Sequence, residues 1–204
     1  SILSLNIRSL ARNISELQLL LHKLNWQFSI ICLQETWSKT EENELPKPEL
    51  AGYNLISLPR ESPKRGGGVG LYVKNNLVCK LRKDLTSTSE NVEMLTIELL
   101  RQKEKNILIS NIYRPPQGTM QPYNESMLQL LNIANRENKP IYIAGDFNLN
   151  LLDYDTEVKV RDFINMMTEY LLLPSINKPT RTTRNSSTCI DNIFVPYSSH
   201  HKLY

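Results

Sequence analysis

The sequence predicts a layered α/β domain in which helices cover two sheets. Three observations favour this class. The chain of 204 residues is long enough for one domain with a hydrophobic core and short for two. Its composition, 40% apolar and 22% charged, is typical of a soluble globular protein. Short apolar runs alternate with amphipathic segments without a long linker, which indicates strands mixed with several helices. This pattern does not fix the order of the strands.

The N-terminal part of the chain predicts a strand, a helix and a second strand. Ile2–Ile7 is an apolar strand candidate. Apolar residues recur at spacings of three and four between residues 14 and 24, and this periodicity predicts an amphipathic helix. The apolar run Ile30–Leu33 predicts a short buried strand, and Glu35 follows it closely.

Two further strands are expected to form a hairpin. Tyr53–Leu58 and Val69–Val73 flank the turn-rich segment Pro59–Gly68. Because this segment contains Lys64 and Arg65, we expect a long basic tip.

The remaining two thirds of the chain continue the alternation of strands and helices. Four segments predict strands: Val92–Leu99, Ile107–Tyr113, Ile141–Ala144 and Ile190–Val195. Two segments have helical periodicity: Tyr123–Asn135 and Val158–Leu172. We therefore expect one domain that spans residues 1–204.

Net charge and cysteine content limit the partners and the cellular compartment that we expect for the protein. The net charge of +3 and the pI of about 8.7 are compatible with a polyanionic partner without requiring one. Cys32, Cys79 and Cys189 are widely spaced and odd in number, which favours free thiols in a reducing, intracellular compartment. We expect no membrane partner, because no apolar run approaches the roughly 20 residues that cross a bilayer. The chain begins with Ser1, so we expect a fragment of a longer protein.

Acidic, amide and phenolic side chains recur where predicted strands end. These strand termini are far apart in sequence, and the set of residues consists of Asn6, Glu35, Tyr113, Asp146, Asn148 and Asp191. If these strand ends cluster, they form one pocket with three carboxylates. For Gly145–Asn148 alone an ordinary turn is the simpler interpretation, because Gly, Asp and Asn all favour turns.

Such a pocket favours phosphate-ester hydrolysis over acyl transfer or redox chemistry. Crowded carboxylates raise one another's pKa unless a cation neutralises them. Mg²⁺ binds oxygen ligands and takes one or two protein carboxylates, and water and substrate phosphate complete its shell. The glycine-rich Gly66–Gly70 lacks the Lys-Ser/Thr of a P-loop, so it is interpreted as a flexible hairpin tip.

Five motifs in order carry a resemblance to a known family. They are Asn6, LQET with Glu35, NIYRPP with Tyr113, AGDFN with Asp146 and Asn148, and KPTRTTRNSSTCIDNIF with Asp191. Over nearly the whole chain the sequence resembles the endonuclease/exonuclease/phosphatase superfamily. Within it, the sequence looks most like the endonuclease domain of non-LTR retrotransposons, which are relatives of the apurinic/apyrimidinic endonucleases.

The resemblance implies a fold, a reaction and partners. The fold is a four-layer α/β sandwich of two mixed sheets flanked by helices, with the site at one edge. The reaction is nicking of double-stranded DNA with Mg²⁺, or with Mn²⁺ in its place, which leaves a 3′-hydroxyl that primes reverse transcription. The implied partners are double-stranded DNA and a reverse transcriptase fused in the full-length element, and the implied location is the nucleus.

The resemblance also implies roles for individual residues. Glu35 binds the metal, and Asn6 lies beside it, although Asn6 is also suited to cap the next turn. Asp146 orients or deprotonates the attacking water, and Asn148 fixes the scissile phosphate and that aspartate. Two further residues complete the site: Tyr113 places its hydroxyl against the phosphate, unless it is a rim aromatic, and Asp191 lies close to the catalytic histidine.

Basic and hydroxyl residues are expected along the DNA path. The candidates are Lys64, Arg65, Arg114, Arg181, Arg184 and Thr188. Charged loops are usually solvated surface, which is the alternative for each arginine and lysine. As DNA contacts, the basic residues would bind phosphates in a salt-dependent way without reading bases.

The C-terminus departs from the family pattern. Members end with a Ser-Asp-His motif and a closing strand, whereas His200 follows Asp191 by 200 − 191 = 9 residues, less than in the family. We therefore expect the motif and the last strand to be missing, and His200 and His201 to be tail residues. Two alternatives to an active endonuclease stay open: a catalytically impaired remnant that keeps the fold and DNA binding, and a phosphatase of the same superfamily.

Overall fold

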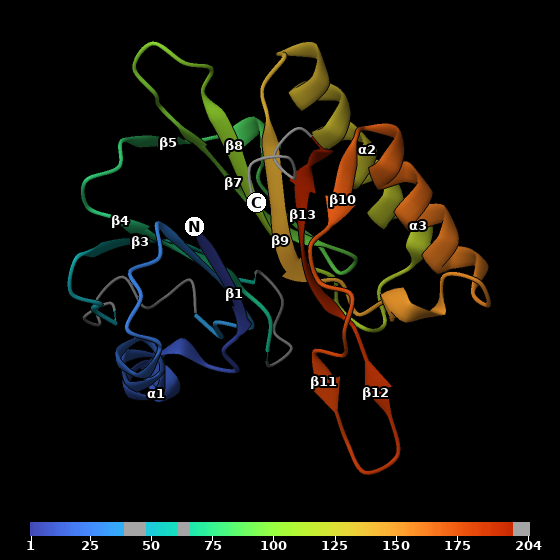
Figure 1. Ribbon diagram of the computed structural model, residues 1–204, viewed down its shortest axis with the longest axis horizontal. Helices are drawn as coiled ribbons and strands as arrows, with labels where there is room; N and C mark the ends of the chain where they lie inside the picture. Colours follow the sequence, from blue (N-terminus) through green and yellow to red (C-terminus); the bar gives the residue numbers. More distant parts are fainter. Residues whose placement is uncertain (39–47, 61–65, 198–204) are drawn as a thin grey trace.

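Two sheets lie face to face and helices cover their outer sides, as the computed structural model shows (Figure 1). It describes residues 1–38, 48–60 and 66–197. The elements are β1 (Ile2–Asn6), α1 (Leu10–Leu24), β2 (Ile30–Gln34), β3 (Tyr53–Leu58), β4 (Val69–Lys74), β5 (Cys79–Leu81), η2 (Lys83–Leu85), β6 (Ser87–Thr88), β7 (Glu93–Leu99), β8 (Ile107–Tyr113), α2 (Met120–Arg136), β9 (Ile141–Asp146), η3 (Leu151–Asp153), α3 (Val158–Glu169), β10 (Leu172–Pro174), β11 (Arg181–Thr182), β12 (Ser187–Thr188) and β13 (Asp191–Pro196).

Both large sheets are mixed, as expected. The first has the order β1-β2-β4-β3, and the second has the order β10-β13-β9-β8-β7-β5, with β6 also paired to β7. The pairs β1–β2 and β8–β9 are parallel and the other pairs are antiparallel. Among the described residues β1 pairs with β2 alone. The predicted hairpin is confirmed by the antiparallel pairing of β3 with β4.

Three hydrophobic clusters separate the layers and confirm the four-layer arrangement. Between the sheets, Leu71 of β4 and Leu95 of β7 are buried in one cluster. A second cluster joins Leu17 of α1 to the outer face of the four-stranded sheet. The third packs α2 and α3 against the seven-stranded sheet through Met127 and Phe163. Burial of apolar surface in these three clusters stabilises the packing of the two sheets and the helices. It thereby fixes the positions of the strand ends relative to one another.

Several element bounds shift by a few residues, and two features depart further from the sequence-based expectation. The helix expected over Val158–Leu172 ends at Glu169, because Leu171 has a positive φ of 56° and Leu172 begins strand β10. The polar stretch around Arg184 forms a two-stranded hairpin, in which the Thr183 amide donates to the Ser186 carbonyl at 2.8 Å. Neither short strand has the apolar alternation from which strands are predicted.

The three cysteines are free thiols, and Cys32 and Cys189 are buried as predicted. Within the described ranges, none of the helices is long and apolar enough to cross a membrane. Four basic or histidine candidates, namely Lys64, Arg65, His200 and His201, lie outside the described residues. The expectations about them, and about a missing last strand, stay predictions.

Candidate active site

Asn6 joins two acidic residues that are far apart in the sequence. Its Nδ2 donates to Glu35 Oε1 at 2.7 Å and to Asp146 Oδ2 at 2.9 Å. Asn6 ends β1, Glu35 follows β2, and Asp146 ends β9. The structure therefore brings together three strand ends that the sequence analysis expected to cluster, at one edge of the two sheets.

Strand register places two more candidates beside Asp146. Tyr113 at the end of β8 pairs with Asp146 in the parallel register, and Asp191 at the start of β13 pairs with it from the other side. The backbone amide of Arg114 donates to the Asp146 carbonyl at 3.0 Å and so fixes this edge. Five of the six predicted site residues therefore lie together, because the strands that carry them end or begin side by side. They are Asn6, Glu35, Tyr113, Asp146 and Asp191.

Burial and charge shift the titration of these groups. Asp146 is 3% exposed, and burial together with the charge of Asp191 raises its pKa to about 6, against hydrogen bonds from Asn6 and Asn148. Burial, and then the charges of Glu35 and Asp146, raise the pKa of Tyr113 well above its ordinary value. Asp146 is therefore suited to accept a proton near neutral pH, and Tyr113 keeps its proton.

The oxygen atoms beside Asn6 fit a hard divalent cation. Asn6 Oδ1 is buried and has no hydrogen-bond partner among the residues that the structure describes. The Nδ2 atom of the same side chain donates to a Glu35 carboxylate oxygen, and amide and carboxylate oxygens are ligands that Mg²⁺ prefers. Glu35 and Asn6 are thus the residues that would hold a metal here.

The three acids of this edge do not together form a metal-binding group among the described residues. No group of three or more His, Cys, Asp or Glu residues in the described ranges is close enough to hold a metal ion. Asp191 turns one oxygen to Thr180, whose Oγ1 donates to Asp191 Oδ2 at 2.7 Å. One oxygen of Asp146 accepts the Asn148 backbone amide at 3.0 Å. The acids share an edge, and each of them has a hydrogen-bond partner within the protein.

Strained backbone surrounds this edge. Five residues other than glycine adopt positive φ here: Arg8 at 47°, Ser9 at 91°, Glu35 at 52°, Trp37 at 55° and Asn148 at 46°. Such conformations cost of the order of 1–3 kcal/mol each and concentrate at functional sites. The surrounding hydrogen bonds hold them, since the Ser9 amide donates to the Glu35 carbonyl at 2.8 Å.

Asn148 has a different contact from the one expected. Its side-chain Nδ2 donates to the Arg114 carbonyl at 2.8 Å. The predicted support of Asp146 comes from the Asn148 backbone. A phosphate contact by the amide stays a prediction, which would require that amide to leave the carbonyl.

The expectation that Arg114 contacts DNA is wrong. Arg114 is 5% exposed, and its guanidinium donates to the carbonyls of Gly118 at 2.7 Å and Asn148 at 3.3 Å. It also lies 5.7 Å from the ring centre of Tyr123. A side chain enclosed in this way ties the turn after β8 to the turn after β9.

The hairpin β11–β12 carries the exposed DNA-path candidates. Arg181 lies on β11 and Arg184 in the turn, and both are exposed on a hairpin that projects from the body (Figure 1). Thr188 donates weakly to the Arg181 carbonyl at 3.5 Å. The hydroxyl beside Asp191 belongs to Thr180, a residue of the KPTR motif that the sequence analysis did not single out.

Trp37 was also missed. Its Nε1 donates to Glu35 Oε2 at 3.3 Å, so it orients the carboxylate that would bind metal. Its place two residues after Glu35 is a signal only once the tight turn between them is known.

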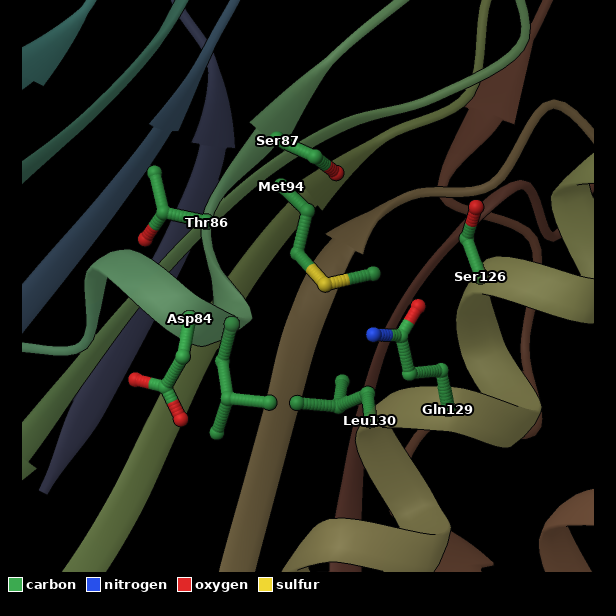
Figure 2. Close-up of a pocket in the computed structure, with 8 residues that line it drawn as sticks. Asp84, Thr86, Ser87, Met94, Ser126, Gln129 and Leu130 are labelled. Atoms are coloured by element: carbon green, nitrogen blue, oxygen red, sulfur yellow. The ribbon is translucent and has the colours of Figure 1, made fainter.

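A cavity of about 170 Å³ lies elsewhere, between η2, β6 and α2. Figure 2 shows Ser126, Gln129 and Leu130 of α2 facing Met94 and the segment of Thr86. This volume is below the roughly 300–1,000 Å³ of small-molecule sites. None of the residues that line the cavity belongs to the acidic edge, the name used here for the sheet edge with Asn6, Glu35, Tyr113, Asp146 and Asp191.

Comparison with solved structures identifies related folds. The endonuclease domain of TRAS1, a telomere-specific non-LTR retrotransposon, superposes with a TM-score of 0.71 at 16% identity, over 97% of this chain and 84% of that one. An AP endonuclease from Leishmania major gives 0.70 at 19% identity, over 96% and 78%. A 3′ phosphatase from Neisseria, bound to product DNA, gives 0.65 at 14% identity, over 97% and 86%. At these identities the likeness shows the fold.

Comparison with curated protein sequences gives no match. A family of nucleases and phosphatases, described as Endonuclease/Exonuclease/phosphatase, matches residues 3–201. This match covers nearly the whole chain and every motif at the acidic edge. The chain therefore belongs to the endonuclease/exonuclease/phosphatase family.

Proposed function

We propose that this chain is a Mg²⁺-dependent DNA endonuclease of a non-LTR retrotransposon. One observation carries the proposal: Asn6 bridges Glu35 and Asp146 while its own Oδ1 stays buried without a partner among the described residues. That arrangement offers oxygen ligands for a cation next to a carboxylate with a raised pKa. Mn²⁺ has the same ligand preference and would substitute.

Each residue at the edge then has a distinct part in phosphodiester hydrolysis. Glu35 and Asn6 hold the metal, which when bound supplies positive charge to the scissile phosphate. Asp146 accepts a proton from the attacking water, whose oxygen bonds to phosphorus while the bond from phosphorus to the 3′ oxygen breaks. The leaving 3′ oxygen takes a proton from solvent and becomes the 3′-hydroxyl. Tyr113, which remains protonated, donates its hydroxyl to a phosphate oxygen. Asp191, fixed by Thr180, keeps a second negative charge beside Asp146 and so raises its basicity.

Double-stranded DNA is the proposed substrate. The projecting hairpin presents Arg181 and Arg184. Thr180 precedes the hairpin and Asp191 follows it, and a hydrogen bond between these two residues joins the base of the hairpin to the acidic edge. Cationic groups next to the acidic edge would hold the phosphate backbone against local repulsion. The DNA-related names of the TRAS1, Leishmania and Neisseria structures are consistent with this substrate. Fusion to a reverse transcriptase and a nuclear location belong to the same proposal.

A phosphatase is the second candidate, because a 3′ phosphatase has the same fold. A labelled DNA duplex that carries a 3′-phosphate on one strand distinguishes the two reactions, because it offers both internal phosphodiesters and a terminal phosphate. We expect Mg²⁺ to permit cleavage at internal phosphodiesters and to leave ends that a DNA polymerase extends. Removal of the terminal phosphate alone would identify a phosphatase. DNA binding without either reaction would identify an impaired remnant.

A further inference from the structure

Three consecutive glycines form a fixed support for the segment that carries Glu35. Gly66, Gly67 and Gly68 have φ values of 101°, 74° and 82°, which side-chain-bearing residues rarely adopt. The Trp37 amide donates to the Gly67 carbonyl at 2.8 Å, and the Thr36 amide donates to the Gly68 carbonyl at 3.0 Å. The sequence alone indicates a flexible tip here, whereas the structure shows two of these glycines hydrogen-bonded to the residues after Glu35.

Arg60 fills the space beside Gly67. A Cβ atom at Gly67 would lie 2.2 Å from Arg60 Cζ, so only glycine leaves room for the guanidinium. Arg60 forms an ion pair with Glu93, which is 1% exposed. The other oxygen of Glu93 accepts the Gly68 amide at 2.6 Å. Glu93 therefore holds both the arginine and the glycine segment.

This cluster borders the acidic edge. Arg60 Cζ lies 5.7 Å from the ring centre of Tyr113, and Glu93 pairs with Tyr113 in the β7–β8 register. The glycine segment reaches Glu35 through Trp37, whose Nε1 donates to the Glu35 carboxylate. A buried ion pair is weak evidence for stability, since apolar residues of similar volume often serve as well. A role in orienting the neighbouring site accounts for its presence.

We propose that the Arg60–Glu93 pair, seated in the space that Gly67 leaves, positions Glu35 for metal binding. The inference rests on the proposed function. Glu35 has a φ of 52°, which a glutamate adopts only when its surroundings enforce it. Glu93 fixes Gly68 and Arg60, the glycine carbonyls fix residues 36 and 37, and Trp37 orients the Glu35 carboxylate. Arg60 and Glu93 are positioning residues, because they act through Glu35.

Metal affinity, measured without DNA, tests the proposal. In a Trp26→Phe background Trp37 is the sole tryptophan, and paramagnetic Mn²⁺ bound at Glu35 would quench its fluorescence. We expect Glu93→Gln to weaken Mn²⁺ binding by about 10- to 100-fold, as loss of a residue that orients a metal ligand does. Glu98→Gln is the matched control, since Glu98 is buried on the same strand and paired with cations. We expect its Mn²⁺ affinity to equal that of the parent.

A glycine pair tests the same point by a smaller change. Gly67→Ala would push the Arg60 guanidinium away, and the long flexible side chain can move without disrupting the core. Gly52→Ala is its control, because Gly52 has a similar φ of 86° and open space around it. Both substitutions strain the backbone, but we expect Gly67→Ala alone to weaken Mn²⁺ binding and alter the Trp37 signal.

The outcomes separate the two levels of inference. Weaker Mn²⁺ binding by Glu93→Gln and Gly67→Ala, with parent-like circular dichroism, would support the positioning role. Parent affinity in a folded Gly67→Ala or Glu93→Gln variant would overturn it and leave the proposed function intact. If Glu93→Gln does not fold, the glycine pair decides. A folded parent that binds no Mn²⁺ would overturn the metal site of the proposed function, and this inference with it.

Discussion

The two ends of strand β7 hold buried glutamates in contrasting surroundings. Glu98 and Glu93 are both at most 1% exposed and both contact an arginine. Glu98 has four partners, namely Lys80, Arg82, Asn106 and Lys139. Despite burial, hydrogen bonds from Lys139, Asn106 and Lys80 hold the pKa of Glu98 at about 2. At Glu93, by contrast, burial keeps the pKa above its ordinary value despite Arg60.

The two clusters also differ in how completely their polar atoms are paired. Within the described part of the chain, four buried atoms near the Glu93 end have no hydrogen-bond partner: Asn6 Oδ1, Gln34 Oε1, Thr36 Oγ1 and Arg60 Nη2. None of the side-chain atoms of the Glu98 network is among the buried unpaired atoms of the described residues. A closed network stabilises a fold, whereas an open one has capacity left for a ligand. The contrast is consistent with a structural role for the Glu98 end and with the functional role that we propose for the Glu93 end.

The largest expected effect is on catalysis at the open cluster, by which we mean the Glu93 end together with Asn6, Glu35 and Asp146 beside it. Asp146→Asn removes the proton acceptor but keeps the size of the side chain. We expect the rate of DNA nicking to fall by about 10²- to 10⁴-fold, the range for loss of a general base. Initial rates on supercoiled plasmid measure this, and circular dichroism confirms folding. A variant that nicks at the parent rate would remove Asp146 from the chemistry.

The closed cluster should show the opposite pattern. We expect Glu98→Gln to lower the free energy of unfolding by about 3 kcal/mol, the lower end for removal of one member of a buried ion pair. The lower end applies because Arg82 and Lys139 keep Glu137 as a partner. Urea denaturation measures the loss. Below the melting temperature its nicking rate should equal that of the parent, and a reduced rate would break the distinction between the two ends.

The pH dependence of stability sharpens the same contrast. The folded pKa of Glu98, about 2, lies below its ordinary value of 4.5, so its contribution is present above pH 4.5. That contribution is lost as pH falls from 4.5 toward 2. We expect the difference in free energy of unfolding between the parent and Glu98→Gln to shrink between pH 5 and pH 3. Denaturation curves across that range measure it, and a constant difference would contradict the assignment.

The smallest expected effect concerns the hairpin. We expect Arg181→Ala or Arg184→Ala to reduce the slope of log affinity for DNA against log salt by about 0.9, the value for one phosphate contact. Arg136→Ala, an exposed arginine on α2, is the matched control. Fluorescence anisotropy at several salt concentrations gives the slopes. Equal slopes for all three variants would show that the hairpin does not contact the backbone.

Most of the fold could be predicted because its signals are local. The periodicity of α1 and the apolar runs of β2, β8 and β9 follow directly from side-chain spacing. Strands β11 and β12 could not be predicted, since their exposed polar residues show no alternation. The end of α3 depends on the left-handed conformation of Leu171, which a leucine sequence does not signal.

The candidate site divides along the same line. Asn6, Glu35 and Asp146 were accessible because each follows a recognisable strand within a motif. The burial of Arg114 was not, because it depends on the Gly118 and Asn148 carbonyls, which only the folded chain brings to it. The joint role of Arg60, Gly67 and Glu93 depends on contacts between residues up to 33 positions apart. Such contacts leave no pattern in a single sequence.

Nicking of supercoiled plasmid by the purified chain, in Mg²⁺ and in EDTA, tests the nature of the open cluster most directly. Glu35→Gln provides the matched variant, because it keeps the side-chain volume and removes the charge. If the cluster is a metal-dependent hydrolytic site, the parent nicks in Mg²⁺, stops in EDTA, and loses its activity with Glu35→Gln. A folded parent that does not nick, or nicking that survives EDTA or the Glu35→Gln change, would contradict that assignment.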